Sequence, residues 1–358
     1  IPIYLGPVLL LVFAPWVLQK MILISKQENI TSIADFIAAR YGKSQSLAVV
    51  VALICMVGVL PYIALQLKGI VLGVNLLIGA GADTTGTRAQ DTALIVSLVL
   101  ALFTIVFGTR NLDATEHHRG MVLAIAFESL VKLFAFLAVG VFVTYGLYDG
   151  FDDLFSQAML APRLEEYWNE TVNWPTMVVQ TGVAMMAIIC LPRQFHVTVV
   201  ENIDPQDLRL AKWVFPACLI LAALFVVPIA LGGKMLLPGS VLPDSYVISL
   251  PLAEAHPILA LLAFIGGASA ATGMVIVASI ALSTMVSNDM LLPWLLRRSS
   301  AERPFEVFRH WMLSVRRVSI VLILLLAYVS YRLLGSSASL ATIGQIAFAA
   351  VTQLGPAM

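Results

Sequence analysis

The chain has 358 residues, of which 60% are hydrophobic and 12% are charged, and its mean hydropathy is +0.93. These values exclude an ordinary soluble domain and are typical of a protein that crosses the lipid bilayer several times. The 21 Lys and Arg residues balance the 21 Asp and Glu residues, so the charge gives no reason to expect a nucleic-acid partner. The three cysteines have unrelated spacings, which predicts neither a disulfide framework nor a metal site.

Nine apolar stretches follow one another along the chain, and most have the roughly 20 residues that a helix needs to cross a bilayer. They cover residues 3–24, 47–79, 92–108, 120–147, 175–191, 213–232, 257–287, 316–334 and 338–355. The sequence therefore predicts an all-α polytopic membrane protein, with one transmembrane domain of about nine membrane helices over residues 1–358.

The Lys and Arg residues between these stretches are distributed unevenly. The loops 25–46, 109–119, 192–212 and 288–317 hold 14 of them, whereas the loops on the other side, together with Arg332 at the end of the eighth stretch, hold 4. Cytoplasmic loops carry the excess of Lys and Arg in membrane proteins. We therefore expect the N-terminus of this chain to lie outside and its C-terminus inside.

The cytoplasmic loop between the first two stretches carries the signals of a short helix at residues 31–44. Ser32 is placed to cap its first turn, and Asp35 complements the positive end of the helix dipole.

The fifth stretch breaks at Pro192, and Arg193, Gln194 and His196 follow at once. Proline removes a backbone donor and clashes with the preceding turn, and the freed groups are tolerated in hydrocarbon only where they face a cavity or protein. Discontinuous membrane helices form binding sites in secondary transporters, so Pro192, Gln194 and His196 are candidate substrate-binding residues. The alternative is that the span ends at Leu191 and that Arg193 meets the lipid headgroups.

Two further polar groups lie inside the expected spans. Glu128 and Lys132 are four residues apart on one helix face, which suits either a structural ion pair or a charge used in coupling. Tyr62 and Gln66 also share a face, just after Pro61, and are candidates for substrate contact or for polar contacts between helices. The sequence has no P-loop, nucleophile–base set or metal-ligand spacing, so we expect neither an enzyme nor a cofactor.

Three segments resemble the solute:sodium symporter family. Residues 30–41 are similar to the segment between its second and third core helices, and residues 283–289 resemble the end of its eighth. Residues 113–116 are similar to the start of its fifth core helix, where Glu116 matches an acidic residue. The resemblance implies an inverted-repeat (LeuT-like) transporter core of ten helices, with the first core helix missing from this chain.

A closer resemblance involves residues 191–202 and 211–216, together with 113–119 and 126–132. These segments are similar to a bacterial subgroup in which a symporter-like domain is fused to a cytoplasmic sensor histidine kinase controlling carbon and nitrogen use. The resemblance implies the bacterial inner membrane, a longer chain with a C-terminal kinase region in cis, and a response regulator as partner. It also suggests L-histidine as the ligand.

One departure from the family affects the choice of coupling ion. Its sodium symporters place adjacent hydroxyls on the eighth core helix, and the matching positions here are Gly273 and Met274, with Thr272 alone nearby. A thioether is a poor ligand for a hard cation, which prefers oxygen. We therefore expect a transporter that does not depend on sodium, and proton coupling is one alternative. The candidate residues for ion or proton coupling are Lys132, Glu128, Glu116 and Thr272.

The leading hypothesis is thus the transporter-type module of a sensor kinase, which binds and moves an amino acid. Two other functions stay open: a self-standing sodium-coupled symporter for another small nutrient, and a ligand receptor that signals without transport.

Overall fold

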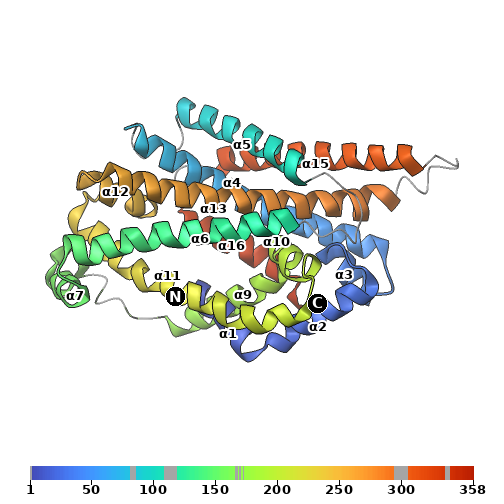
Figure 1. Ribbon diagram of the computed structural model, residues 1–358, viewed down its shortest axis with the longest axis horizontal. Coiled ribbons are helices and arrows are strands. Elements are labelled where there is room, and N and C mark those ends of the chain that lie inside the picture. The colour runs from blue at the N-terminus through green and yellow to red at the C-terminus, as the bar shows by residue number, and fades with distance from the viewer. Residues whose placement is uncertain are drawn as a thin grey trace.

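The computed structural model describes residues 2–80, 86–108, 119–165, 168, 171, 173–293, 305–334 and 339–358. Every regular element in these ranges is helical. The long helices α5, α6, α13 and α15 run roughly along the longest axis of the molecule (Figure 1), and α13 packs against the other three. This arrangement confirms the expected all-α fold.

Seven helices in the described ranges are long and apolar enough to cross a membrane, or up to nine if each of two bent pairs forms one span. These spans coincide with the nine predicted stretches. The unbroken spans are α4 (Gln45–Leu77), α5 (Thr87–Gly108), α6 (Arg119–Val141) with η1 (Phe142–Leu147), α11 (Leu208–Leu236), α13 (Pro257–Met285) with η6 (Val286–Leu291), α15 (Phe305–Leu334), and α16 (Leu340–Thr352) with η7 (Gly355–Ala357).

The fifth span is broken where the sequence predicts a break. The helix α9 (Trp174–Cys190) ends before Leu191, and α10 (Pro192–Phe195) with η3 (His196–Val200) continues at an angle of 50°. Leu191 has extended backbone angles, φ −65° and ψ 122°. A residue that precedes proline favours this conformation because the proline ring clashes with a helical one.

A second break, which was not predicted, divides the first span. The helices α1 (Pro2–Phe13) and α2 (Pro15–Glu28) meet at 74°. Ala14 between them is not helical, with φ −130° and ψ 42°, and Pro15 is the first residue of α2. Proline suits this position because the first N–H of a helix has no acceptor within it.

Short helices lie at both ends of the bundle. Figure 1 places α7 (Phe151–Leu160) at one end of the long axis and α3 (Ile33–Arg40) at the opposite end. The charge distribution assigns the loops that contain these two helices to opposite sides of the membrane, and their positions agree with that assignment. A further short helix, α12 (Tyr246–Ala253), packs on α13.

The helix α3 is capped as predicted. Ser32 Oγ accepts a hydrogen bond from the Asp35 N–H at 2.9 Å, and Asp35 Oδ2 accepts one from the Thr31 N–H at 3.1 Å. Burial raises the pKa of the Asp35 carboxyl, while the hydrogen bond from Thr31 opposes that rise. Ser32 Oγ also donates to Asp289 Oδ2 at 2.8 Å, and both side chains are buried. One hydroxyl therefore caps α3 and ties it to η6.

Further polar contacts extend this connection to α15. Asn288 Nδ2 donates to Thr31 Oγ1 at 3.4 Å, and Arg316 Nη2 donates to Asn288 Oδ1 at 3.4 Å. Arg316 Nε also donates to Ser287 Oγ at 3.3 Å. The end of the seventh span is thus held between α3 and α15.

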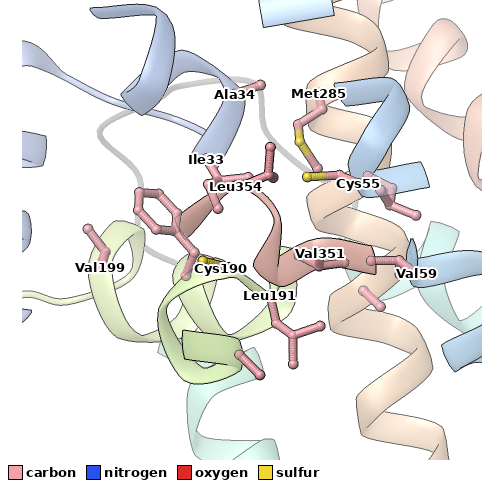
Figure 2. Close-up of a cluster of buried hydrophobic side chains, with 14 of the residues drawn as sticks. Ile33, Ala34, Cys55, Val59, Cys190, Leu191, Val199, Met285, Val351 and Leu354 are labelled. Atoms are coloured by element: carbon pink, nitrogen blue, oxygen red, sulfur yellow. The ribbon is translucent and has the colours of Figure 1, made fainter. Parts of the chain in front are cut away.

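The broken helix is fixed by apolar packing on several sides (Figure 2). A cluster of buried hydrophobic side chains joins the break between α9 and α10 to α3, α4, the end of α13 and the end of α16. A methyl group at Gly58 of α4 would overlap the side chain of Val351, so the glycine allows α16 to approach closely. The labelled members of the cluster are Ile33, Ala34, Cys55, Val59, Cys190, Leu191, Val199, Met285, Val351 and Leu354.

Replacing Ser32 with alanine should lower the free energy of unfolding by about 1–3 kcal/mol, because it removes a cap and leaves the buried Asp289 oxygen without this donor. Ser339 is a matched control, since it caps α16 by accepting from the Thr342 N–H at 3.1 Å at an exposed position. Thermal unfolding in detergent should show a larger loss for Ser32→Ala than for Ser339→Ala. Equal losses would mean that the contact with Asp289 contributes nothing.

Candidate functional site

Tyr62 of α4 lies at the centre of a cluster built from four separate elements. Its side chain is 7% exposed, and its hydroxyl donates to Met274 Sδ of α13 at 3.0 Å. The Phe348 ring of α16 stacks on the Tyr62 ring, with 6.4 Å between centroids. The Arg193 guanidinium of α10 lies 5.8 Å from the centroid of the same ring. The candidate substrate residue Tyr62 is therefore in contact with the broken helix.

Arg193 is the first residue after the buried Pro192. Its guanidinium makes a cation–π contact with Tyr62. Its Nε is fully buried and has no hydrogen-bond partner among the described residues. The sequence reasoning did not select Arg193 as a binding residue. The sequence feature that could have identified it is a cationic residue directly after a proline break within a membrane span, since charged residues inside spans usually have a function.

The Glu128 carboxylate of α6 lies against Gly273 of α13. A methyl group at position 273 would overlap both carboxylate oxygens, so the absence of a side chain there makes room for Glu128. Glu128 is half-buried and interacts electrostatically with Lys132 and Arg193. Among the described residues, however, none lies within 4 Å of it as an ion-pair partner.

Lys132 lies one turn along α6 from Glu128, and its side chain is exposed. The other side of α6 presents an apolar stripe whose members are each between 64% and 72% exposed: Leu123, Phe127, Leu130 and Phe134. This stripe suits contact with lipid, whereas an ammonium group inside a membrane faces water or protein. The face of α6 that carries Glu128 and Lys132 therefore borders the interior of the protein or a water-filled space.

The remaining candidates are placed in different ways. Gln66 and Gln194 are half-buried, and the side chain of neither makes a hydrogen bond to a described residue. The Thr272 hydroxyl donates to the Ala268 carbonyl of its own helix at 2.8 Å. Glu116 lies outside the residues that the structure describes.

His196 contacts Glu201 rather than the cluster around Tyr62. Its Nε2 lies 3.3 Å from Glu201 Oε1, and both side chains are buried. The Glu201 N–H donates to the His196 carbonyl at 2.9 Å, which is the i→i+5 hydrogen bond of a π-helical turn. This turn brings residues five apart onto one side, so the pair could not be recognised from α-helical spacing. His196 belongs to a second buried polar site on the broken helix.

Comparison with known proteins gives a weak sequence match and a clear structural one. No protein-family model matches the chain. It is 26% identical over 144 residues to the uncharacterized symporter YhjB of Bacillus subtilis (strain 168), a match that covers 40% of this chain and about a quarter, 26%, of that relative's length.

The solved structure of a Na+-coupled sialic acid symporter, in a substrate-bound outward-open state, matches 98% of this chain and 71% of its own chain. The TM-score is 0.64 and the sequence identity is 14%. At this identity the likeness shows the fold alone. The chain is therefore a multi-pass membrane protein with the LeuT fold that this symporter adopts.

Proposed function

We propose that the chain is a transporter module that binds and moves an amino acid, with L-histidine as the leading candidate. The observation that carries this proposal is the cluster at the broken helix, where Tyr62, Arg193 and Glu128 come from three elements. Discontinuous helices form substrate sites near the bilayer midplane in transporters. A zwitterionic solute needs a cation and an anion close together, and the cluster supplies both. The side chains of Gln66 and Gln194, which make no hydrogen bond to a described residue, offer donors and acceptors for a polar side chain of the solute.

The same site supports transport that does not depend on sodium. Gly273 offers no side-chain oxygen, Met274 offers sulfur, and the Thr272 hydroxyl already donates along its own helix. Sodium prefers several oxygen ligands. Lys132 provides a positive charge on the neighbouring helix α6, whose residues Glu128 and Lys132 lie against Gly273 and Gly266 of α13. We propose that this ammonium replaces the coupling ion, and that transport is proton-coupled if Lys132 loses its proton during the cycle.

Replacing sodium with choline should leave uptake by the purified protein in proteoliposomes within about twofold of its original rate. The reason is that the Lys132 ammonium group would supply the positive charge that a sodium ion supplies in a sodium-coupled transporter. The measurement uses radiolabelled L-histidine at fixed pH and membrane potential. Strict dependence on sodium would instead favour a sodium-coupled symporter. Binding without any uptake would favour a receptor that signals without transport.

We also propose that the module serves a sensor histidine kinase in the bacterial inner membrane, with the N-terminus of this chain outside and its C-terminus inside. The support is the similarity of residues 191–202 to the fused subgroup and the 14-to-4 distribution of Lys and Arg. Signalling would then pass to a response regulator. Sequencing the parent gene beyond the codon for Met358 tests this proposal, which requires a dimerisation helix with a phospho-acceptor histidine.

A further inference from the structure

The charges of the cluster around Tyr62 do not balance, and the buried contact of His196 with Glu201 lies outside this cluster. Arg193 and Lys132 are cations, Glu128 is the one carboxylate among the described residues that interacts with both, and no two of these three groups form an ion pair within 4 Å. The Arg193 Nε is buried without a hydrogen-bond partner among the described residues. A guanidinium has five N–H donors, and leaving a buried donor unsatisfied is costly. The cluster therefore has the capacity to accept one more anionic group.

We infer that Arg193 binds the carboxylate of the transported amino acid, while Glu128 receives its ammonium group. The inference rests on the proposed function and names the residues that would recognise the solute. A guanidinium and a carboxylate form two parallel hydrogen bonds, which orients the ligand as well as binding it. The Tyr62 ring restricts the guanidinium on one side. Glu128 rests on Gly273, so its oxygens are held at the surface of α13.

This arrangement explains why the break lies immediately before Arg193. In an unbroken helix the chain after Cys190 would continue along the axis of α9. The extended Leu191 and the 50° bend instead redirect the chain, and the Arg193 guanidinium then meets Tyr62 of α4, a residue 131 positions earlier. The break thus brings a cation within electrostatic range of Glu128, a carboxylate on a third helix.

The test measures binding of L-histidine and of two analogues to the purified protein by calorimetry. L-Histidinamide lacks the carboxylate, and imidazolepropionate lacks the ammonium group. The wild-type protein should bind each analogue at least about tenfold more weakly than L-histidine, as expected for the loss of one charged hydrogen-bonding pair.

Arg193→Gln should weaken L-histidine binding by a similar factor and leave L-histidinamide binding unchanged, so that the protein no longer distinguishes the two. Glu128→Gln should remove the preference over imidazolepropionate instead. Arg193→Lys keeps the charge without the second hydrogen bond and should retain part of the preference for the carboxylate. Arg209→Gln, at an exposed position at the start of α11, is the matched control and should bind all three ligands as the wild type does.

Two results would overturn the inference: an Arg193→Gln variant that still prefers L-histidine over its amide, and a wild type that does not distinguish them. If Arg193→Gln fails to fold, the inference is tested by comparing the binding of L-histidine and L-histidinamide to the wild type and to Arg193→Lys. A wild type that binds no amino acid in a panel refutes the proposed function. If it then binds sialic acid, comparison of that acid with its methyl ester in Arg193→Gln tests the arginine separately.

Discussion

Replacing Gly273 with alanine should reduce uptake at least about tenfold without unfolding the protein. The added methyl group would overlap the Glu128 carboxylate, which lies at the end of a flexible side chain and can move aside. The fold is therefore retained, but the carboxylate leaves its place beside Arg193 and Lys132. Losing one charged hydrogen bond to a ligand corresponds to a factor of about 10–100 in affinity.

Gly267 of the same helix is a control for helix propensity, because a methyl group there would have no atom within 4 Å. Gly267→Ala should transport normally. In a Glu128→Ala background, Gly273→Ala should have no further effect, since the group that it displaces is already absent. Uptake assays and thermal unfolding of all four variants check this prediction. Additive losses of uptake would show that Gly273 acts independently of Glu128.

Replacing Lys132 with alanine should abolish most uptake, by at least about tenfold, and leave thermal unfolding nearly unchanged. The side chain is exposed and has no ion-pair partner within 4 Å among the described residues. The substitution therefore breaks no ion pair in the described part of the chain. Substitutions at exposed positions of this kind usually change the free energy of unfolding by no more than about 0.5 kcal/mol. A charge that replaces the coupling ion, by contrast, is needed in every transport cycle.

The alternative of a structural pair between Lys132 and Glu128 makes the opposite prediction. Lys132→Ala would then give little folded protein, and Glu128→Ala would rescue it, because an uncompensated buried charge is strongly destabilising. Lys212→Ala is a control of the same charge and size, since Lys212 lies near the start of α11 and contacts the Trp213 ring. That variant should transport normally.

The spans could be predicted from the sequence because length and hydropathy together determine whether a helix suits the bilayer. The break at Pro192 was predictable for a second reason, since polar residues follow the proline inside an apolar stretch. The break at Ala14 was not predicted, although Pro15 is present in the sequence. Pro15 lies near the middle of the first apolar stretch and is followed by three apolar residues, Trp16 to Leu18. No polar residue directly beside this proline therefore marks a change of direction, as Arg193 does after Pro192.

The candidate site was predictable in part. The sequence identified Tyr62, Glu128 and Lys132 because polar groups inside a membrane span are costly and usually have a structural or functional role. Their partners were not predictable, because they depend on tertiary contacts: Tyr62 meets Met274 across 212 residues. The spacing of Glu128 and Lys132 suggested a direct pair. The Glu128 carboxylate instead packs against α13, where Gly273 has no side chain to exclude it. The contact of His196 with Glu201 depends on a π-helical turn that no sequence pattern indicated.

The hydrogen bond between Ser32 and Asp289 has a consequence for how the protein folds during its synthesis. The two residues are 257 positions apart, and a ribosome adds about 5–20 residues per second. About 13–50 seconds therefore pass between the synthesis of α3 and that of its acceptor. During this interval the Ser32 hydroxyl has only water or a transient protein as acceptor. This contact of α3 can form only after six further spans have been made, so it cannot start the assembly of the bundle.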